Sequence, residues 1–297
     1  MVALTGASGF VGRAVRARLA ARGVPVRPLV RRAALPVEAH WNPGVRHLDP
    51  EVLAGVTAVV HLAGENLTSG PWTRARRQRL VASRVGSTTL LAETVARLSQ
   101  PPAVLITASA IGIYGDRGDE ILTEDSEPGS GFLADLVSDW EGAAAPAAAA
   151  GIRLVHLRFG VILGAGGGIM ARLLPIFRLG LGGPLGSGKQ WMSWVSLPDA
   201  VSVIDQAIDH AGFTGPLNVT APHPVRNAEF TRELAAALRR PARFRVPAFL
   251  LELLLGDLAR EAVLASAQVQ PARLDALGFE FADPKLSEAL PHLLGSA

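Results

Sequence analysis

Apolar and polar positions follow two periods along the chain, one typical of buried strands and one typical of amphipathic helices. The run Val2–Thr5 is short and wholly apolar apart from its last residue. The segment after it places apolar residues on one helical face, namely Phe10, Val11, Ala14, Val15 and Leu19. We expect this helix to end at Gly23, which suits a left-handed C-terminal cap, and a second strand to follow at Val24–Val30.

The same alternation continues to about residue 163. Apolar runs predict further strands, which are Val45–Leu48, Ala58–Ala63, Ala103–Ser109 and Arg153–Leu163. Helical spacing predicts a long helix over Thr73–Leu98, ended by Pro101 and Pro102, and another over Phe132–Ala145. Strands that alternate with helices predict an α/β fold with a doubly wound parallel sheet.

The second half of the chain changes character. Glycines punctuate short elements at 164–168, 180–183 and 186–188. We therefore expect a main domain over residues 1–220, with substrate-side segments from about 165. A small, mostly helical C-terminal α/β region is expected over residues 246–294.

Three glycines join the first strand to the first helix in the sequence Thr-Gly-Ala-Ser-Gly-Phe-Val-Gly, residues 5–12. In a Rossmann-like unit Gly6 permits the tight turn, Gly9 lets the backbone approach a pyrophosphate, and Gly12 lets the helix pack closely. The amides around Ser8, Phe10 and Val11 would then face the anion at the positive end of the helix. The alternative is an ordinary strand-to-helix turn.

The end of the second predicted strand indicates which dinucleotide binds. NAD-binding units carry an acidic residue about 20 residues beyond the glycines, where it accepts hydrogen bonds from the ribose 2′-hydroxyl. This chain has Arg31 and Arg32 there. Guanidinium groups pair with a 2′-phosphate, so the sequence predicts NADP(H). The alternative is that both arginines are solvated.

Composition narrows the function classes. The sequence pI is near 10.1, yet the formal net charge is only +3, and the densest arginine cluster lacks interleaved aromatic residues, which argues against nucleic acid. There is no cysteine, hence no disulfide or thiolate site. The longest apolar stretch, Phe249–Leu255, is too short to span a bilayer. We expect a cytoplasmic protein without membrane or nucleic-acid partners.

Four motifs together resemble the extended short-chain dehydrogenases/reductases of the NAD-dependent epimerase/dehydratase superfamily. They are the glycine turn, His61-Leu-Ala-Gly-Glu-Asn66, Ser109-Ala-Ile-Gly-Ile-Tyr-Gly115 and Leu157-Arg-Phe-Gly-Val-Ile-Leu-Gly164. The chain is most similar to the atypical branch labelled as nucleotide-sugar epimerases, which has a short C-terminal domain. The resemblance implies that the cofactor is lined by Gly6, Gly9, Gly12, Arg31, Leu62, Ala63, Gly64, Arg84 and Val161.

The chain departs from the superfamily at its catalytic pair. That pair is Tyr-x-x-x-Lys on the helix after the fifth strand, where the lysine lowers the tyrosine pKa for proton transfer. The only tyrosine here is Tyr114, and the only lysines are Lys189 and Lys285. The matching helix begins Phe132-Leu-Ala-Asp-Leu-Val137 and holds neither residue type at its start.

Three residues remain as catalytic candidates. Ser109 ends the fifth strand, where the superfamily's serine polarises a carbonyl, or it is a hydroxyl that caps the strand. Tyr114 is expected in the loop over the nicotinamide, or as a packed aromatic with its hydroxyl at the surface. Lys189 could reach the site on a glycine-rich loop, or it is a solvated lysine. His61 and His156 lie in apolar strands without metal spacing, so no metal site is expected.

Two functions fit these observations. One is an NADP(H)-dependent oxidoreductase or epimerase that acts on an unknown small molecule. The other is a non-catalytic protein that binds NADPH as a sensor or regulator. The sequence leaves the choice between a monomer and a homodimer open.

Overall fold

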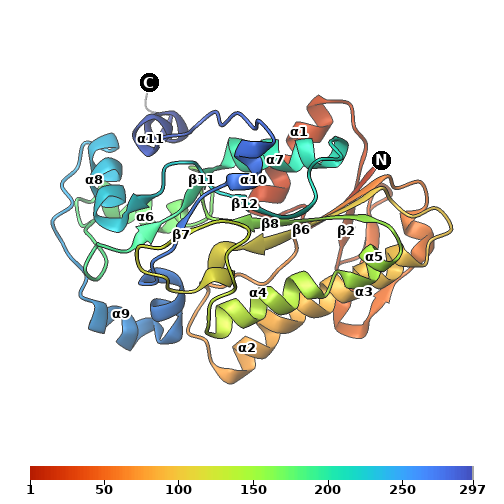
Figure 1. The fold of residues 1–297 in the computed structure, drawn as a ribbon, viewed down its shortest axis with the longest axis horizontal. Helices are drawn as coiled ribbons and strands as arrows, with labels where there is room; N and C mark the ends of the chain where they lie inside the picture. Colours follow the sequence, from red (N-terminus) through yellow and green to blue (C-terminus); the bar gives the residue numbers. More distant parts are fainter. Residues whose placement is uncertain (296–297) are drawn as a thin grey trace.

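The computed structural model describes residues 1–295, and an eight-stranded sheet runs through its centre (Figure 1). In spatial order the strands are β12 (Gly215–Val219), β8 (Arg153–Phe159), β6 (Val104–Ala110), β5 (Ala58–His61), β1 (Val2–Thr5), β2 (Val26–Val30), β3 (Ala39–Asn42) and β4 (His47–Leu48). All neighbours are parallel except β3 and β4. The order reverses on either side of β1, which confirms the doubly wound, Rossmann-like sheet.

Helices cover both faces of the sheet (Figure 1). One layer holds α1 (Phe10–Ala21), α7 (Leu197–Asp209) and α10 (Ala272–Ala276), and the other holds α3 (Ser87–Ala96), α4 (Phe132–Gly142) and α5 (Ala145–Ala149). Alternate strand residues pack into opposite layers: Leu4 and Ile106 lie in the core with α1 and α7, whereas Ala3 and Leu105 lie in the core with α3. Burial on both faces explains why the strands have continuous apolar sequences.

The long helix predicted over Thr73–Leu98 is real but not uniform. It consists of α2 (Arg74–Val81), a π-helical turn η3 (Ala82–Gly86) and α3. The Thr73 hydroxyl caps its start by accepting a hydrogen bond from the amide of Arg76. A π turn is rare and often marks a functional position.

Two strand predictions were wrong in detail. The sequence 153–163 forms two strands, β8 and β9 (Val161–Leu163), because β9 leaves the sheet to pair with β11 (Trp194–Ser196). The break falls at Gly160, where a Cβ atom would lie 2.6 Å from the backbone oxygen of Ser193. Strands β3 and β12 were not predicted, and the expected strand Val45–Leu48 is reduced to β4 after the 3₁₀ turn η1 (Pro43–Val45).

The second half of the chain builds a smaller lobe beside the sheet. Its helices are α6 (Met170–Arg178), α8 (Asn227–Ala237), α9 (Ala248–Leu255) and α11 (Leu286–Leu294), with a π turn η5 (Ala259–Val263). The short strands β10 (Trp191–Met192) and β13 (Val225–Arg226) pair with each other, and β14 (Gln268–Val269) pairs with β7 (Ile121–Leu122). Two further 3₁₀ turns are η2 (Pro50–Leu53) and η4 (Ile111–Tyr114).

The C-terminal residues pack onto the main sheet domain at several points. Leu258 lies in an apolar cluster with Trp72 and Leu136. The Glu261 carboxylate accepts a hydrogen bond of 2.7 Å from the amide of Leu133 and so caps the start of α4. Among residues 1–295, no helix is both long and apolar enough to cross a bilayer.

Candidate functional site

The glycine turn between β1 and α1 is shaped as its sequence predicts. Gly6 has φ +68°, and a Cβ atom there would lie 2.7 Å from the backbone of Leu62. A Cβ atom on Gly12 would overlap the carbonyl oxygen of Gly6, and the amide of Gly9 donates a 2.9 Å hydrogen bond to that same oxygen. Side chains at Gly6 and Gly12 would therefore force the turn away from β5 or push the helix off the turn.

The start of α1 leaves donors free for an anion. Gly9 is the N-cap, with no side chain that caps the helix, and the first turn holds no acidic residue. The amides of Phe10 and Val11 therefore have no acceptor within the helix and lie at the positive end of its dipole. A dinucleotide pyrophosphate fits this geometry, because it supplies the missing acceptors and carries negative charge.

Thr5 ties the end of β5 to the glycine turn. Its hydroxyl lies 3.1 Å from the amides of Leu62 and Ala63, from which it accepts hydrogen bonds, and 2.7 Å from His61 Nδ1. The His61 Nε2 atom lies 3.2 Å from the Ser87 hydroxyl. Burial lowers the pKa of His61 to about 4, so this histidine is neutral and holds the two strand ends together.

The two arginines after β2 have different surroundings. Arg32 forms a bidentate pair with Glu38, with both N–O distances at 2.7 Å, and also donates to the backbone oxygen of Ala33. Arg31 is exposed and has no ion-pair partner among residues 1–295. Of the two, only Arg31 has a guanidinium that is free to meet a 2′-phosphate.

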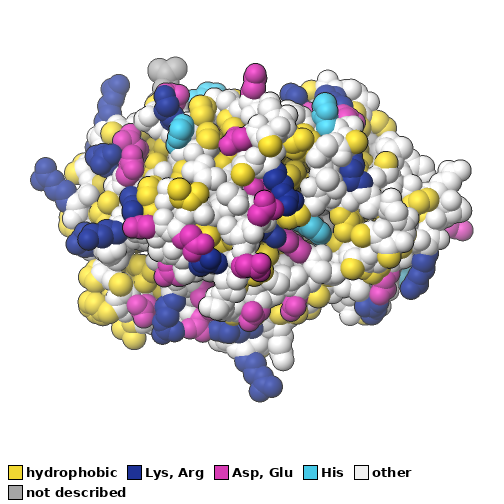
Figure 2. All heavy atoms as spheres, viewed as in Figure 1, with side chains coloured by type: hydrophobic (Ala, Val, Ile, Leu, Met, Phe, Trp, Pro, Cys, Tyr) yellow, Lys and Arg dark blue, Asp and Glu magenta, His cyan; other side chains and the backbone are white. Residues whose placement is uncertain are grey.

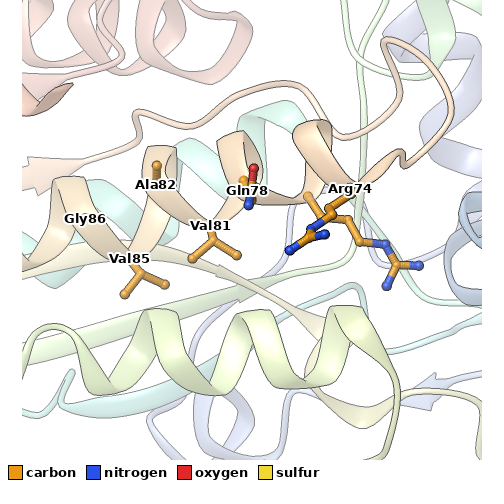
Figure 3. A pocket seen from close by; sticks show the side chains of 7 residues that line it. Arg74, Gln78, Val81, Ala82, Val85 and Gly86 are labelled. Carbon is orange, nitrogen blue, oxygen red and sulfur yellow. The ribbon is translucent and has the colours of Figure 1, made fainter.

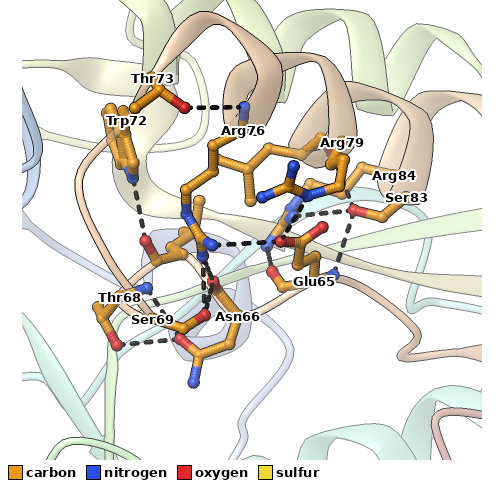
Figure 4. A network of polar contacts seen from close by, with 12 residues as sticks. Glu65, Asn66, Thr68, Ser69, Trp72, Thr73, Arg76, Arg79, Ser83 and Arg84 are labelled. Atoms are coloured by element: carbon orange, nitrogen blue, oxygen red, sulfur yellow. Dashed lines mark hydrogen bonds and ion pairs between the residues drawn. The ribbon is translucent and has the colours of Figure 1, made fainter.

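The loop after β5 is held by two arginines of α2, of which Arg76 is buried and Arg79 is exposed (Figure 4). Arg76 donates to the backbone oxygen of Asn66 and lies 3.3 Å from the carboxylate of Glu65. Arg79 approaches the same carboxylate at 3.4 Å. One acidic side chain is thus shared by two arginines, which leaves excess positive charge at the carboxyl end of β5.

Arg84 lies in the π turn η3 and faces this loop (Figure 4). Its guanidinium donates a 2.9 Å hydrogen bond to the backbone oxygen of Glu65 and lies 5.2 Å from the ring of Trp140. A Cβ atom at Gly64 would be 3.5 Å from the guanidinium carbon. Burial lowers the pKa of Arg84 to about 10, while the charge of Glu65 opposes that shift, so Arg84 is charged at neutral pH.

Ser109 is the last but one residue of β6 and is held by a buried ion pair. Its hydroxyl donates a 2.6 Å hydrogen bond to Glu141 Oε1, from α4. Arg158, from β8, donates two 2.9 Å hydrogen bonds to the same carboxylate. The side chain of Arg158 is only 8% exposed and that of Glu141 only 14%. Burial alone would raise the pKa of Glu141, but the hydrogen bonds and charge of Arg158 outweigh it and the pKa is lowered.

Tyr114 is packed, as one of the two sequence-based interpretations expected, but its hydroxyl is not at the surface. It is fully buried in η4, where its hydroxyl donates to Asn218 Oδ1 at 2.7 Å and accepts from Arg158 Nη1 at 2.9 Å. Burial raises its pKa, although Arg158 opposes that shift. The hydroxyl is neither at the surface nor free in a cleft, because Arg158 and Asn218 occupy it.

Lys189 is placed away from this network. Its side chain is exposed and forms no hydrogen bond or ion pair with any residue that the structure describes. Its backbone oxygen accepts a hydrogen bond from Arg226, on β13. Of the three catalytic candidates, the structure joins Ser109 and Tyr114 through Glu141 and Arg158 and leaves Lys189 in solvent.

Sequence analysis did not single out Glu141, Arg158 or Asn218. An arginine inside the apolar strand Arg153–Leu163 was a usable signal, because an arginine is rarely buried without a partner. Val161 lies half-buried at the start of β9, and Leu62 and Ala63 are half-buried after β5. Within residues 1–295, no three metal-binding side chains come together.

A separate groove of about 740 Å³ follows the helix α2–η3 (Figure 3). It is lined by Arg74, Arg77, Gln78, Val81, Ala82, Val85 and Gly86. Val81 and Val85 project toward α4, and no residue of the glycine turn or of the Ser109 network lines the groove. The groove therefore belongs to the outer face of the helix layer and not to the Ser109 network.

Comparisons with known proteins agree with this geometry. Residues 2–219 match the NAD dependent epimerase/dehydratase family, and residues 246–293 match a domain of unknown function, DUF1731. The chain is 42% identical over 291 residues to epimerase family protein Mb2239 of Mycobacterium bovis, covering 98% of this chain and 96% of that protein.

Solved structures give the same result. The crystal structure of human epimerase family protein SDR39U1 with NADPH superposes with a TM-score of 0.90 at 32% identity, over 100% of this chain and 99% of that one. A nucleoside-diphosphate sugar epimerase from Corynebacterium glutamicum gives 0.83 at 38% identity, over 99% of this chain and 58% of that one. This chain belongs to the NAD dependent epimerase/dehydratase family, and within it to the branch that carries a DUF1731 domain.

Proposed function

We propose that this protein is an NADP(H)-dependent oxidoreductase or epimerase that acts on a small molecule. The observation that carries the proposal is the uncapped start of α1 beside a tight glycine turn, with Arg31 unpaired after β2. The human relative solved with NADPH supports the same cofactor. The expected cytoplasmic location stays a prediction.

Each part of the cofactor has residues suited to hold it. The turn at Gly6, Ser8 and Gly9, with the first amides of α1, would hold the pyrophosphate. Arg31 would pair with the 2′-phosphate. The remaining lining would come from Leu62, Ala63, Gly64, Arg84 and Val161. When bound, the nicotinamide supplies or accepts a hydride.

The Ser109 hydroxyl has one proton, which it donates in its hydrogen bond to Glu141. The oxygen therefore presents lone pairs to a substrate and can accept a hydrogen bond from a substrate hydroxyl. To donate to a carbonyl oxygen, Ser109 must first turn away from Glu141. Because Arg158 lowers the pKa of Glu141, that carboxylate is ionised at neutral pH and accepts the hydrogen bond of the serine hydroxyl.

A second function rests on a specific observation. Tyr114 is enclosed, and the helix α4 offers no lysine to assist proton transfer. A protein that binds NADPH without catalysis, as a sensor or regulator, is consistent with that arrangement.

Two experiments test these proposals. Calorimetry should show NADPH binding at least tenfold tighter than NADH, a difference of about 1.4 kcal/mol. Arg31→Ala should abolish that preference, whereas Arg32→Ala, whose guanidinium is occupied by Glu38, is the matched control and should retain most of it. Equal affinities in the wild-type protein would refute the NADP(H) assignment.

The second experiment separates enzyme from sensor. NADPH oxidation is followed with a panel of carbonyl compounds and nucleoside-diphosphate sugars. Turnover that falls at least tenfold in Ser109→Ala, with NADPH affinity retained, supports the enzyme. Tight NADPH binding without turnover on any substrate supports the sensor.

A further inference from the structure

Helix α9 exposes an apolar face. Phe249, Leu253 and Leu254 are 72%, 78% and 64% exposed. Single exposed apolar residues are common on protein surfaces, whereas a cluster of them marks an interaction site. On the opposite side, Leu251 is buried and Leu255 packs against the cluster around Leu258. The helix is therefore held to the protein by one side while its other side offers phenylalanine and leucine to the surroundings.

Neighbouring segments extend this face. Leu179 and Leu181 follow α6 and are exposed, as is Phe244 in the segment that leads into α9. These segments lie side by side: the amide of Phe244 donates to the oxygen of Gly182 at 3.1 Å, and the amide of Gly186 donates to the oxygen of Val246 at 2.8 Å. We call the six exposed residues the α9 face; they are Leu179, Leu181, Phe244, Phe249, Leu253 and Leu254.

The α9 face is bordered by unpaired positive charge. Arg178, Arg239, Arg240, Arg243 and Arg245 come from the same segments and are all exposed. None of the five has a carboxylate partner among residues 1–295. Helix α9 itself has one acidic residue, Glu252, and its carboxylate is already paired with Arg260. Figure 2 shows basic side chains at the left end of the molecule, above the apolar side chains of the region where Figure 1 places α9.

The apolar α9 face and its arginine border together indicate what binds there. A second copy of the chain, docked by the same face, would bring arginine-rich borders together, and like charges across an interface are unfavourable. An anionic lipid surface satisfies both features, because its headgroups neutralise the arginines and its acyl boundary takes up the protruding side chains. The protrusion of Phe249 and Leu253 from the end of the molecule suits insertion into such a boundary.

We propose that the α9 face docks the protein on membranes that contain anionic lipid. The sequence predicts no membrane contact because Phe249–Leu255 is too short to span a bilayer. Docking at the interface needs only one apolar helix face with a cationic border, and α9 provides it.

The test is co-sedimentation of the whole protein with vesicles of phosphatidylcholine alone or mixed with phosphatidylserine. We expect binding only to the mixed vesicles, weakened by added salt. The double variant Phe249→Glu, Leu253→Glu should lose at least tenfold in affinity. Val45→Glu, Ile121→Glu changes two comparably exposed residues elsewhere and should bind as the wild type does.

A second set of variants examines the charge. Each of Arg240→Gln and Arg243→Gln should weaken binding to the mixed vesicles about fivefold, since a basic residue near an anionic surface contributes about that factor. Circular dichroism of every variant checks that it is folded.

Three outcomes would overturn the proposal. One is no binding to phosphatidylserine vesicles. Another is equal loss of binding in the Val45 and Ile121 control. The third is a wild-type dimer in sedimentation velocity that the Phe249 and Leu253 variant converts to monomer, because the face would then be covered by a second copy.

Discussion

Replacing Arg158 with methionine should destabilise the protein strongly. The substitution keeps most of the side-chain volume but removes two 2.9 Å hydrogen bonds to Glu141 and one to the Tyr114 hydroxyl. Glu141 is then left as a buried carboxylate, with the Ser109 hydroxyl as its remaining partner. Breaking a buried pair from one side lowers the free energy of unfolding by about 3–5 kcal/mol, because the other charge is uncompensated.

The size of the effect depends on the charge that is left behind. Glu141→Gln alone should be similarly harmful, since it leaves Arg158 buried and charged. The double variant Arg158→Met, Glu141→Gln leaves neither charge of this pair behind, so it should lose at least about 2 kcal/mol less than the two single losses combined. Urea unfolding with an unchanged m-value measures all three.

Acid should narrow the gap between wild type and Arg158→Met. In the wild type the pKa of Glu141 is lowered by folding, so its contribution to stability is present above the ordinary pKa and is lost as the pH falls through the folded value. Without Arg158, burial raises that pKa, and protonation at lower pH relieves the buried charge. A loss under 1 kcal/mol for Arg158→Met, or strict additivity in the double variant, would refute the reasoning.

Three further predictions concern other parts of the site. Gly12→Ala should weaken NADPH binding more than tenfold in calorimetry and lower the free energy of unfolding by about 1–3 kcal/mol, because its Cβ overlaps the Gly6 oxygen; Gly9→Ala, with 3.1 Å to the same oxygen, should be much milder. The lowered pKa of His61, about 4, means that stability is lost as the pH falls from about 6.5 towards 4, by up to about 1.4 kcal/mol per pH unit. In urea titrations His61→Asn should reduce that slope, and an unchanged slope would contradict the assignment. Tyr114→Phe should lower stability by about 1–3 kcal/mol, because Asn218 loses its donor, while the Kd for NADPH stays unchanged; an altered Kd would mean that the hydroxyl reaches the cofactor.

The parts of the fold that the sequence predicted are those encoded over short distances. The start of α1 and its three glycines lie within eight residues, and both the turn and the helix occur as predicted. The strands β1, β2, β5, β6 and β8 were likewise recognised, whereas β3 and β12 were missed. The break at Gly160 was missed because its cause, the backbone of Ser193, is 33 positions away in the chain and adjacent only after folding.

The candidate site was less predictable for the same reason. Glu141 and Arg158 come from a helix and a strand, and nothing in either segment alone shows that they pair. Tyr114 was expected either in the loop over the nicotinamide or packed with its hydroxyl at the surface, but η4 turns the hydroxyl inward to Arg158 and Asn218. Arg32 was expected to bind phosphate, yet Glu38, six residues later, already holds its guanidinium.

The π turn η3 sets the rotational phase between the two halves of one continuous helix. Each residue of an α-helix advances the helix by about 100°, so the wider turn at Ala82–Gly86 offsets α3 from α2. This offset lets α2 face the Glu65 loop and the C-terminal lobe while α3 faces the sheet. Winding this stretch as an α-helix with its length unchanged would turn one half by roughly the 100° of one residue, whereas deleting one residue would close the π turn and leave the phase of the two halves nearly unchanged. This stretch should therefore tolerate a one-residue deletion better than an insertion.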